Sequence, residues 1–167
     1  MKWNNKFNYP KSSRSIENGL RKYLIDGEKL PSVTSVIDFT KSAEDKAAIA
    51  NWRERTGEAL ANKIQKDAAN RGGKMHSFLE KYLLGKLNLS FFEKNEQFQK
   101  MAEIIIKKGL KDRLQEIWGV EVTLSYPKKY CGTADCLGIF EEKETCIDFK
   151  QSNKLKKIDF VQDWFYQ

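Results

Sequence analysis

Hydrophobic residues recur with a helical period through the first two thirds of the chain. Residues 43–70 are mostly polar, and Trp52, Leu60 and Ile64 give this stretch one apolar side. Such a pattern predicts a surface helix that rests on a core along a single face. The paired glycines Gly72 and Gly73 should interrupt this helix, because glycine weakens a helix interior.

Two further helices are predicted downstream of the glycines. Apolar residues within residues 74–84 follow the spacing i, i+3, i+4, i+7, i+8, which is one buried helical face. A third helix is predicted over residues 95–118. The apolar residues that define these two helices are Met75, Phe78, Leu79, Tyr82 and Leu83 in the first, and Phe98, Met101, Ile105, Leu114, Ile117 and Trp118 in the second.

After Gly119 the period changes from that of a helix to that of a strand. Val120, Val122 and Leu124 alternate with polar residues, which predicts a strand over residues 120–126. Residues 127–129 form a turn, a second strand covers residues 130–140, and a polar loop at 141–144 leads to a third strand at 145–150. Helices followed by an antiparallel meander indicate a mixed α/β or an α+β domain.

The beginning of the chain is polar. Residues 1–29 are rich in Asn, Lys and Ser and are predicted to be a polar arm, with the main domain over residues 30–167. The stretch "LPSVTSVI" then places Ser32, Thr34 and Ser35 beside short apolar residues. Two interpretations are open, namely a helix start with a capping residue and a turn that contacts phosphate. The residues alone favour the capped helix.

Length and charge narrow the class of protein only modestly. The chain has 167 residues, enough for one domain with a sizeable core. Thirty Lys and Arg against 23 Asp and Glu give a net charge of +7. A basic surplus is compatible with a polyanionic partner such as nucleic acid, although many basic proteins have none.

Targeting segments and structural cysteines are not predicted. The tightest apolar cluster is the run of three isoleucines at 104–106, too short to cross a membrane. The first ten residues match no signal or transit peptide, so we expect a cytoplasmic protein with no membrane partner. Three cysteines without a C-x2-C pair argue against a disulfide framework and against zinc.

Candidate chemistry gathers on the last two predicted strands. Asp148 and Lys150 are two residues apart and should share one face of a strand. Asp135 lies on the preceding strand, where an antiparallel pair can bring its carboxylate near that of Asp148. Two such carboxylates repel each other unless a cation lies between them, and Mg²⁺ suits hard oxygen ligands. Lys150 could then hold or deprotonate a water, or neutralise charge on a phosphoryl group.

His76, the one histidine in the chain, lies at the edge of the predicted apolar helical face. A lone histidine in that place is more often structural than a ligand. Here Glu80 follows one turn later, so the two side chains are neighbours along the helix. The glycine pair before them would let another segment of the chain approach closely.

Taken in order, these residues resemble a known family. The series His76, Glu80, Gly132-x2-Asp135 and Asp148-x-Lys150 is similar to the PD-(D/E)XK nucleases, and within them to the RecB-like exonucleases of phage and mitochondrial type. The stretches that carry the resemblance are "LPSVTSVI", Trp52-Arg53, "RGGKMHSFLE", "GVEVTL", "GTAD" and "IDFKQSNK". The resemblance extends from about residue 30 to the last residue.

The resemblance implies a restriction-endonuclease-like core, with a central mixed sheet flanked by helices. It also implies a Mg²⁺ or Mn²⁺ ion and no iron–sulfur cluster. Glu121 receives no firm role. The roles implied for individual residues are metal binding for His76, Asp135, Asp148 and the backbone carbonyl of Phe149, catalysis for Lys150, and support of the site for Glu80.

For the stretch "LPSVTSVI", the resemblance favours contact with DNA over the capped helix that the residues alone favour. Ser32, Thr34 and Ser35 match a segment expected to contact DNA. The family also has a Gln-x3-Tyr motif on the helix after the lysine. Gln162 and Tyr166 have that spacing, but we prefer Gln167 as the glutamine of the motif, which implies that the C-terminal part of the fold is missing. The DNA contacts expected in addition are Arg53, Arg71 and Gln167.

The function implied is a metal-dependent DNA exonuclease that hydrolyses phosphodiester bonds from DNA ends in recombination, repair or replication. Its partner would be DNA that is single-stranded or has free ends; protein partners are unknown. A phage source would place it in the host cytoplasm. The alternatives are a structure-selective endonuclease on the same core, a non-catalytic nucleic-acid-binding module, and a protein-interaction domain with this fold.

Overall fold

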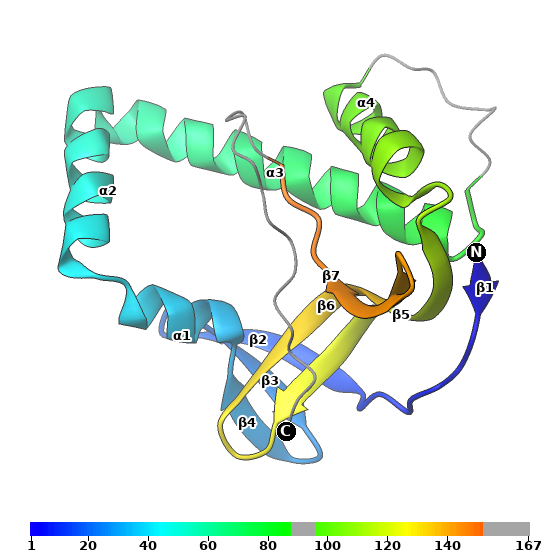
Figure 1. The fold of residues 1–167 in the computed structure, drawn as a ribbon. Coiled ribbons are helices and arrows are strands. Elements are labelled where there is room, and N and C mark those ends of the chain that lie inside the picture. Colours follow the sequence, from blue (N-terminus) through cyan, green and yellow to red (C-terminus); the bar gives the residue numbers. More distant parts are fainter. Residues whose placement is uncertain (88–95, 152–167) are drawn as a thin grey trace. The chain divides into compact units, whose positions relative to one another are not determined.

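The chain has a mixed α/β fold, as predicted (Figure 1). Its structure, a computed structural model, describes residues 1–87 and 96–151. The described elements are the strands β1 (Lys2–Trp3), β2 (Ser12–Glu17), β3 (Leu20–Ile25), β4 (Glu28–Pro31), β5 (Leu114–Tyr126), β6 (Tyr130–Phe140) and β7 (Lys143–Ile147), the helices α1 (Val33–Thr40), α2 (Ala43–Thr56), α3 (Glu58–Leu83) and α4 (Gln97–Ile104), and the π-helix η2 (Ile105–Leu110).

The chain divides into two compact units. The first comprises Met1–Asn8, Asn70–Val122 and Ala134–Gln167, and the second comprises Tyr9–Ala69 and Thr123–Thr133. Each unit is a separate set of contacts. The residues with candidate chemistry, His76, Glu80, Asp135, Asp148 and Lys150, all belong to the first unit.

The predicted meander is confirmed. Strands β5, β6 and β7 are neighbours in that order, and β6 and β7 pair antiparallel with Cys136 opposite Ile147. Strand β1 adds to β5 in parallel, with Trp3 opposite Ile117, so this sheet is mixed. The indole Nε1 of Trp3 also donates to the carbonyl of Leu83 at 3.3 Å, which ties the N-terminal strand to the end of α3.

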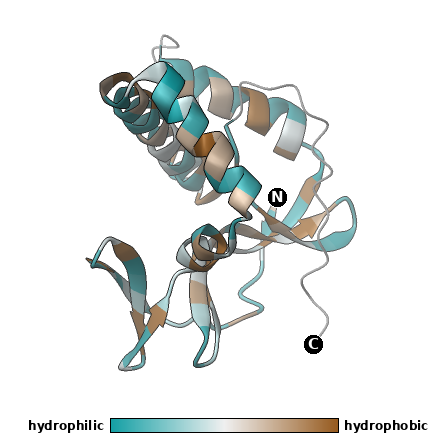
Figure 2. Cartoon of the chain, turned by 90° about the vertical axis from the view of Figure 1, so that its left-hand side faces the viewer, coloured by the Kyte–Doolittle hydropathy of each residue, from teal (hydrophilic) through white to brown (hydrophobic). Residues whose placement is uncertain are grey.

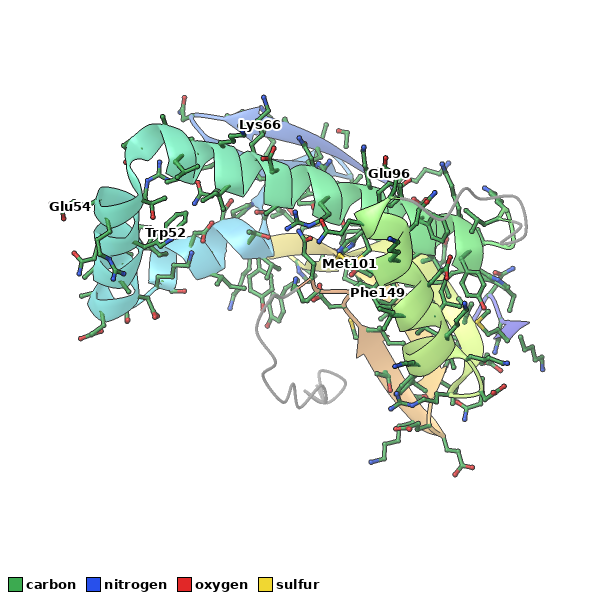
Figure 3. The ribbon with its side chains drawn as sticks, turned by 90° about the horizontal axis from the view of Figure 1, so that it is seen from above. Trp52, Glu54, Lys66, Glu96, Met101 and Phe149 are labelled. Carbon is green, nitrogen blue, oxygen red and sulfur yellow. The ribbon has the colours of Figure 1, made fainter. Side chains whose placement is uncertain are left out.

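The main hydrophobic core confirms the helical face predicted for residues 74–84. Met75 and Leu79 are fully buried, and Phe78 and Leu83 are nearly so. They pack in one cluster with residues of η2, β5 and β6 and with Phe149, while Met101 packs on its periphery. Figure 3 labels Phe149, just after β7, and Met101 on α4. The three-and-four spacing therefore identified the face of α3 that the sheet covers.

The predicted break at the glycine pair is wrong. Helix α3 runs without interruption from Glu58 to Leu83, through Gly72 and Gly73. The break lies earlier, at Gly57, whose φ of 81° ends α2 and whose N–H donates to the Arg53 carbonyl. Burial of the apolar face outweighs the cost of two helical glycines, about 1 kcal/mol each.

The third predicted helix is also too long. Helix α4 passes into η2 and ends at Leu110, and strand β5 begins at Leu114, where the prediction continued the helix to residue 118. Asp112 has a φ of 61°, which no α-helix accepts. Leu114 and Ile117 have helical spacing, but both are buried in a strand that pairs with two others. Sheet pairing thus overrode the local period.

The polar arm predicted for residues 1–29 contains ordered strands. Strands β2, β3 and β4 form an antiparallel sheet in the second unit. Its two turns, Asn18-Gly19 and Asp26-Gly27, have positive φ at both residues. Asn-Gly and Asp-Gly between strands are strong hairpin signals that the prediction did not use. A small core completes this sheet, formed by Tyr23, Ile25, Leu30 and Cys131.

The capped-helix interpretation of "LPSVTSVI" is confirmed. Ser32 is the N-cap of α1, and its Oγ accepts the backbone N–H of Ser35 at 3.0 Å. Helix α2, which follows, has no buried residue among its described positions and is mostly hydrophilic (Figure 2). None of the helices in the described parts of the chain is long and apolar enough to cross a membrane.

A prediction follows for the closest backbone contact in the sheet. A Cβ on Gly138 would lie 2.0 Å from the carbonyl oxygen of Glu116, because β6 and β5 approach closely there. We expect Gly138→Ala to lower the free energy of unfolding by about 3 kcal/mol. Gly73→Ala is the matched control, since a Cβ there meets nothing within 4 Å. It should raise stability by about 0.5–1 kcal/mol.

Urea denaturation of the two variants and the wild type measures both effects. Equal stability of Gly138→Ala and wild type would contradict the close approach of the two strands.

Candidate metal centre

Three side chains with metal-ligating groups converge in the first unit. His76 comes from α3, Glu121 from β5 and Asp135 from β6. One ligand atom of each lies within 4.8 Å of the other two. Two of these residues, His76 and Asp135, were predicted as metal ligands from the sequence, and the fold brings them together across 59 residues of chain.

Asp135 is the buried centre of this group. Its Oδ1 lies 3.3 Å from Nδ1 of His76, and its Oδ2 accepts the backbone N–H of Phe149 at 2.6 Å. The ring of Phe149 meets the His76 ring edge-on, with 6.2 Å between centroids. A buried carboxylate requires such partners. They fix the positions of α3 and of the segment after β7 relative to β6.

The pKa of His76 is raised above its ordinary value, chiefly by its hydrogen bond to Asp135. Burial of the ring opposes this shift, and the negative charges of Asp135 and Glu121 add to it, as does a hydrogen bond with the Phe149 backbone. Both carboxylates therefore favour a positive charge at this point. A divalent cation would satisfy the same preference with the histidine neutral.

Glu121 enters the group through an unusual backbone conformation. Its φ is 51°, in the left-handed region, although it lies inside β5. A non-glycine residue in that region costs roughly 1–2 kcal/mol and persists where its surroundings hold it. Regular alternation predicts that Glu121 lies on the same side of the strand as Thr123, but the left-handed φ departs from the regular geometry on which that expectation rests. No sequence signal marks this conformation, so the sequence could not assign Glu121 a role.

The donor set fits a divalent metal ion. One imidazole nitrogen and two carboxylate oxygens suit Mn²⁺, and carboxylate oxygens also suit Mg²⁺. Ligand atoms at about 2.1 Å from an ion are at most about 4.2 Å apart. Small side-chain rotations would bring the three groups from their present separations to that range.

The Asp148–Lys150 pair lies beside this group, and its predicted place inside the third strand is wrong. Strand β7 ends at Ile147, so Asp148 and Lys150 belong to the segment that follows it. Their side chains contact each other, as their spacing predicted, with Lys150 Nζ 2.8 Å from Asp148 Oδ2. Both are exposed. The close approach of the Asp148 and Asp135 carboxylates, and the roles of Asp148 and Lys150, stay predictions.

Two other predicted site residues flank the group. Glu80 is partly buried one helical turn after His76, and its backbone carbonyl accepts the N–H of Leu84. Phe149 is buried. Its backbone N–H donates to the Asp135 carboxylate, and its backbone also forms a hydrogen bond with His76. Support by Glu80 and coordination by the Phe149 carbonyl remain predictions.

A close contact occurs at one of the two glycines, although the helix is not interrupted there. A Cβ on Gly72 would lie 2.9 Å from the side-chain Nε2 of Gln151, so a larger residue there would displace this amide. The neighbouring Arg71 donates from Nε to Gln151 Oε1 at 2.9 Å. The residue directly after Lys150 is therefore held against α3.

The residues predicted to contact DNA occupy varied surroundings. Ser32 is 2% exposed and caps α1, whereas Thr34 on the first turn is exposed. Arg53 donates to the carboxylate of Glu58 and to the side chains of Gln65 and Asn62 in the second unit. Ser35 is partly buried beside Ser32 and Arg71 bonds to Gln151, while Gln167, Gln162 and Tyr166 lie outside the described residues. The DNA contacts of these residues stay predictions.

Comparison with known proteins gives one weak relationship. The chain is 28% identical over 137 residues to mitochondrial genome maintenance exonuclease 1 of Mus musculus. The match covers 77% of this chain and 39% of the mouse protein, so the chain spans well under half the length of that relative. No protein-family profile matches the chain.

The strained glutamate provides a test of the metal centre. Loss of a residue that hydrogen-bonds a metal ligand lowers metal affinity by about tenfold or more. Loss of a ligand itself should cost at least as much, so we expect Glu121→Asn to lower Mn²⁺ affinity by at least about tenfold. Asparagine tolerates a positive φ, so the fold should survive. Glu142→Asn is the matched control: Glu142 also has a positive φ, 65°, but lies in the turn between β6 and β7.

Calorimetric titration with Mn²⁺ measures the affinity, and urea denaturation verifies the fold. The same affinity in both variants would exclude Glu121 from the metal centre.

Proposed function

We propose that the chain is a divalent-metal-dependent nuclease that hydrolyses phosphodiester bonds of DNA from free ends. The observation that carries the proposal is the convergence of His76, Glu121 and Asp135 next to the segment that bears Asp148 and Lys150. A metal centre with an adjacent lysine is a common arrangement for phosphodiester hydrolysis. The resemblance to PD-(D/E)XK nucleases supports the same assignment.

Asp135 has two tasks in this proposal. One oxygen faces the metal position with His76, and the other holds the N–H of Phe149. Because Phe149 lies between Asp148 and Lys150, this hydrogen bond limits the positions that both side chains can reach. Gln151, held against α3 by Arg71, restrains the same segment from its other side.

In hydrolysis, the oxygen of a water molecule forms a new bond to phosphorus while the bond to the leaving ester oxygen breaks. His76, Glu121 and Asp135 would hold a metal ion, which would polarise the phosphoryl oxygens and lower the pKa of the attacking water. Lys150 contributes a positive charge that can orient this water or offset charge on the phosphoryl group. The proton lost by the water passes to solvent, and the leaving oxygen acquires one from solvent.

Two further findings support DNA as the substrate. The net charge of +7 favours a polyanion, whose binding would weaken as salt rises. The name of the mouse relative describes an exonuclease in genome maintenance, which is our reason to prefer action at ends. The identity of the ion, Mg²⁺ or Mn²⁺, and the single-stranded preference belong to the proposal as well.

The test is cleavage of end-labelled single- and double-stranded DNA in the presence of Mg²⁺ or Mn²⁺. We expect Lys150→Ala and Asp135→Ala to lose at least about a hundredfold in rate, since the first removes a positive charge beside the phosphoryl group and the second removes a metal ligand. Chelation by EDTA should abolish cleavage. Lys29→Ala, an exposed lysine on β4 paired with Glu17, should cleave like the wild type.

Covalently closed circular DNA distinguishes the exonuclease hypothesis from the endonuclease hypothesis. An enzyme that requires ends spares the circle, whereas a structure-selective endonuclease opens it. Unchanged cleavage in both Lys150→Ala and Asp135→Ala would overturn the proposed mechanism.

A further inference from the structure

A cavity of about 680 Å³ lies in the first unit, next to the residues that the proposed mechanism uses. Its walls come from η2, from the β6–β7 hairpin and from the segment after β7. The volume is within the range of about 300–1,000 Å³ that is usual for small-molecule sites. The apolar part of the wall is formed by Ile105, Leu110, Phe140, Ile147 and Phe149.

One wall of the cavity presents a flat cationic group. The guanidinium of Arg113 lies 4.6 Å from the centroid of the Phe140 ring and pairs with Glu141 through Nε at 2.8 Å. All three residues line the cavity. A guanidinium supported in this way by an aromatic ring and a carboxylate is a stacking surface for an unpaired base.

The cavity is continuous with the candidate catalytic segment. Asp148, Phe149 and Lys150 all line it. Phe149 also contacts the metal centre, through its backbone bond to Asp135 and its ring contact with His76. A phosphate bound at the metal centre would therefore have its nucleoside within reach of these walls.

We propose that this cavity is the subsite for the unpaired base of the nucleotide joined to the scissile phosphate. The inference deepens the proposed function and rests on it. A nucleotide combines an apolar flat base with an anionic phosphate. The cavity combines apolar walls with three basic residues, Arg113, Lys143 and Lys150, against two carboxylates, Glu141 and Asp148. A lipid tail would match the apolar walls but would offer no anionic group to the basic residues.

Cys146 is a natural probe of the cavity. It lines the wall and is exposed, whereas Cys131 and Cys136 are fully buried. A maleimide reagent at constant pH should therefore label Cys146 in the folded protein. The probe ligands are a five-residue thymidine oligonucleotide and the same oligonucleotide with abasic residues at both ends, in EDTA so that no hydrolysis occurs.

We expect the thymidine oligonucleotide to slow labelling by about tenfold, which is within the range of stacking energies per base. The abasic oligonucleotide should slow it much less. Equal labelling rates with the two oligonucleotides would overturn the proposal. This readout needs no activity, so it remains decisive even if the chain cleaves nothing and the proposed function fails.

Cleavage gives a second, independent readout. Ile105→Trp places an indole in the cavity, so the rate ratio between base-bearing and abasic ends should fall from about tenfold in the wild type to near one. Circular dichroism establishes that the variant is folded. A ratio that stays at the wild-type value in a folded Ile105→Trp protein would overturn the proposal.

Chemical blocking supplies the matched control for the probe. Maleimide-treated wild type should lose cleavage of base-bearing ends. The Cys146→Ser variant should cleave at the same rate with and without the reagent. Loss of activity in treated Cys146→Ser would show that the reagent acts elsewhere, and full activity of labelled wild type would contradict a base in the cavity.

Discussion

The candidate site depends on one buried carboxylate. Asp135 accepts the N–H of Phe149 with one oxygen and faces the imidazole of His76 with the other, so a single side chain joins β6, α3 and the segment after β7. Neither oxygen could be buried without such partners, because an unpaired charge in an apolar environment is costly. The requirement to satisfy Asp135 therefore positions the histidine and the Asp148–Lys150 segment at once.

Two departures from regular geometry occur in the same unit as this carboxylate. Glu121 has a left-handed backbone inside β5, and α4 continues as the π-helix η2 beside the cavity. Regular structure is the lower-energy choice for these sequences, and irregular segments are often found at functional sites. Glu121 supplies the third ligand group, and η2 supplies Ile105 to the cavity wall. One irregularity thus brings a side chain to the candidate metal centre, and the other brings one to the cavity wall.

Local sequence patterns predicted much of the fold. The apolar spacing that includes Met75 and Leu79 identified the buried face of α3, and alternation after Gly119 identified the meander. Predictions were wrong where a tertiary contact outweighed a local preference. The glycine pair stays helical because the core covers its helix, and Leu114 joins a strand because two neighbouring strands pair with it. The Asn18-Gly19 hairpin was readable from the sequence and was overlooked.

For the site, the sequence by itself determined which residues carry suitable chemistry and their order along the chain. It named His76 and Asp135 as metal ligands because the ordered series of residues from His76 to Lys150 resembles that of the PD-(D/E)XK nucleases. Only the tertiary structure decided that Glu121 joins them and that Asp148 and Lys150 lie beyond the end of β7. The physical reason is that a side chain's direction depends on backbone dihedrals and on partners distant in sequence. Glu121 reaches the group through a strained φ that is stable only when the strands around it are assembled.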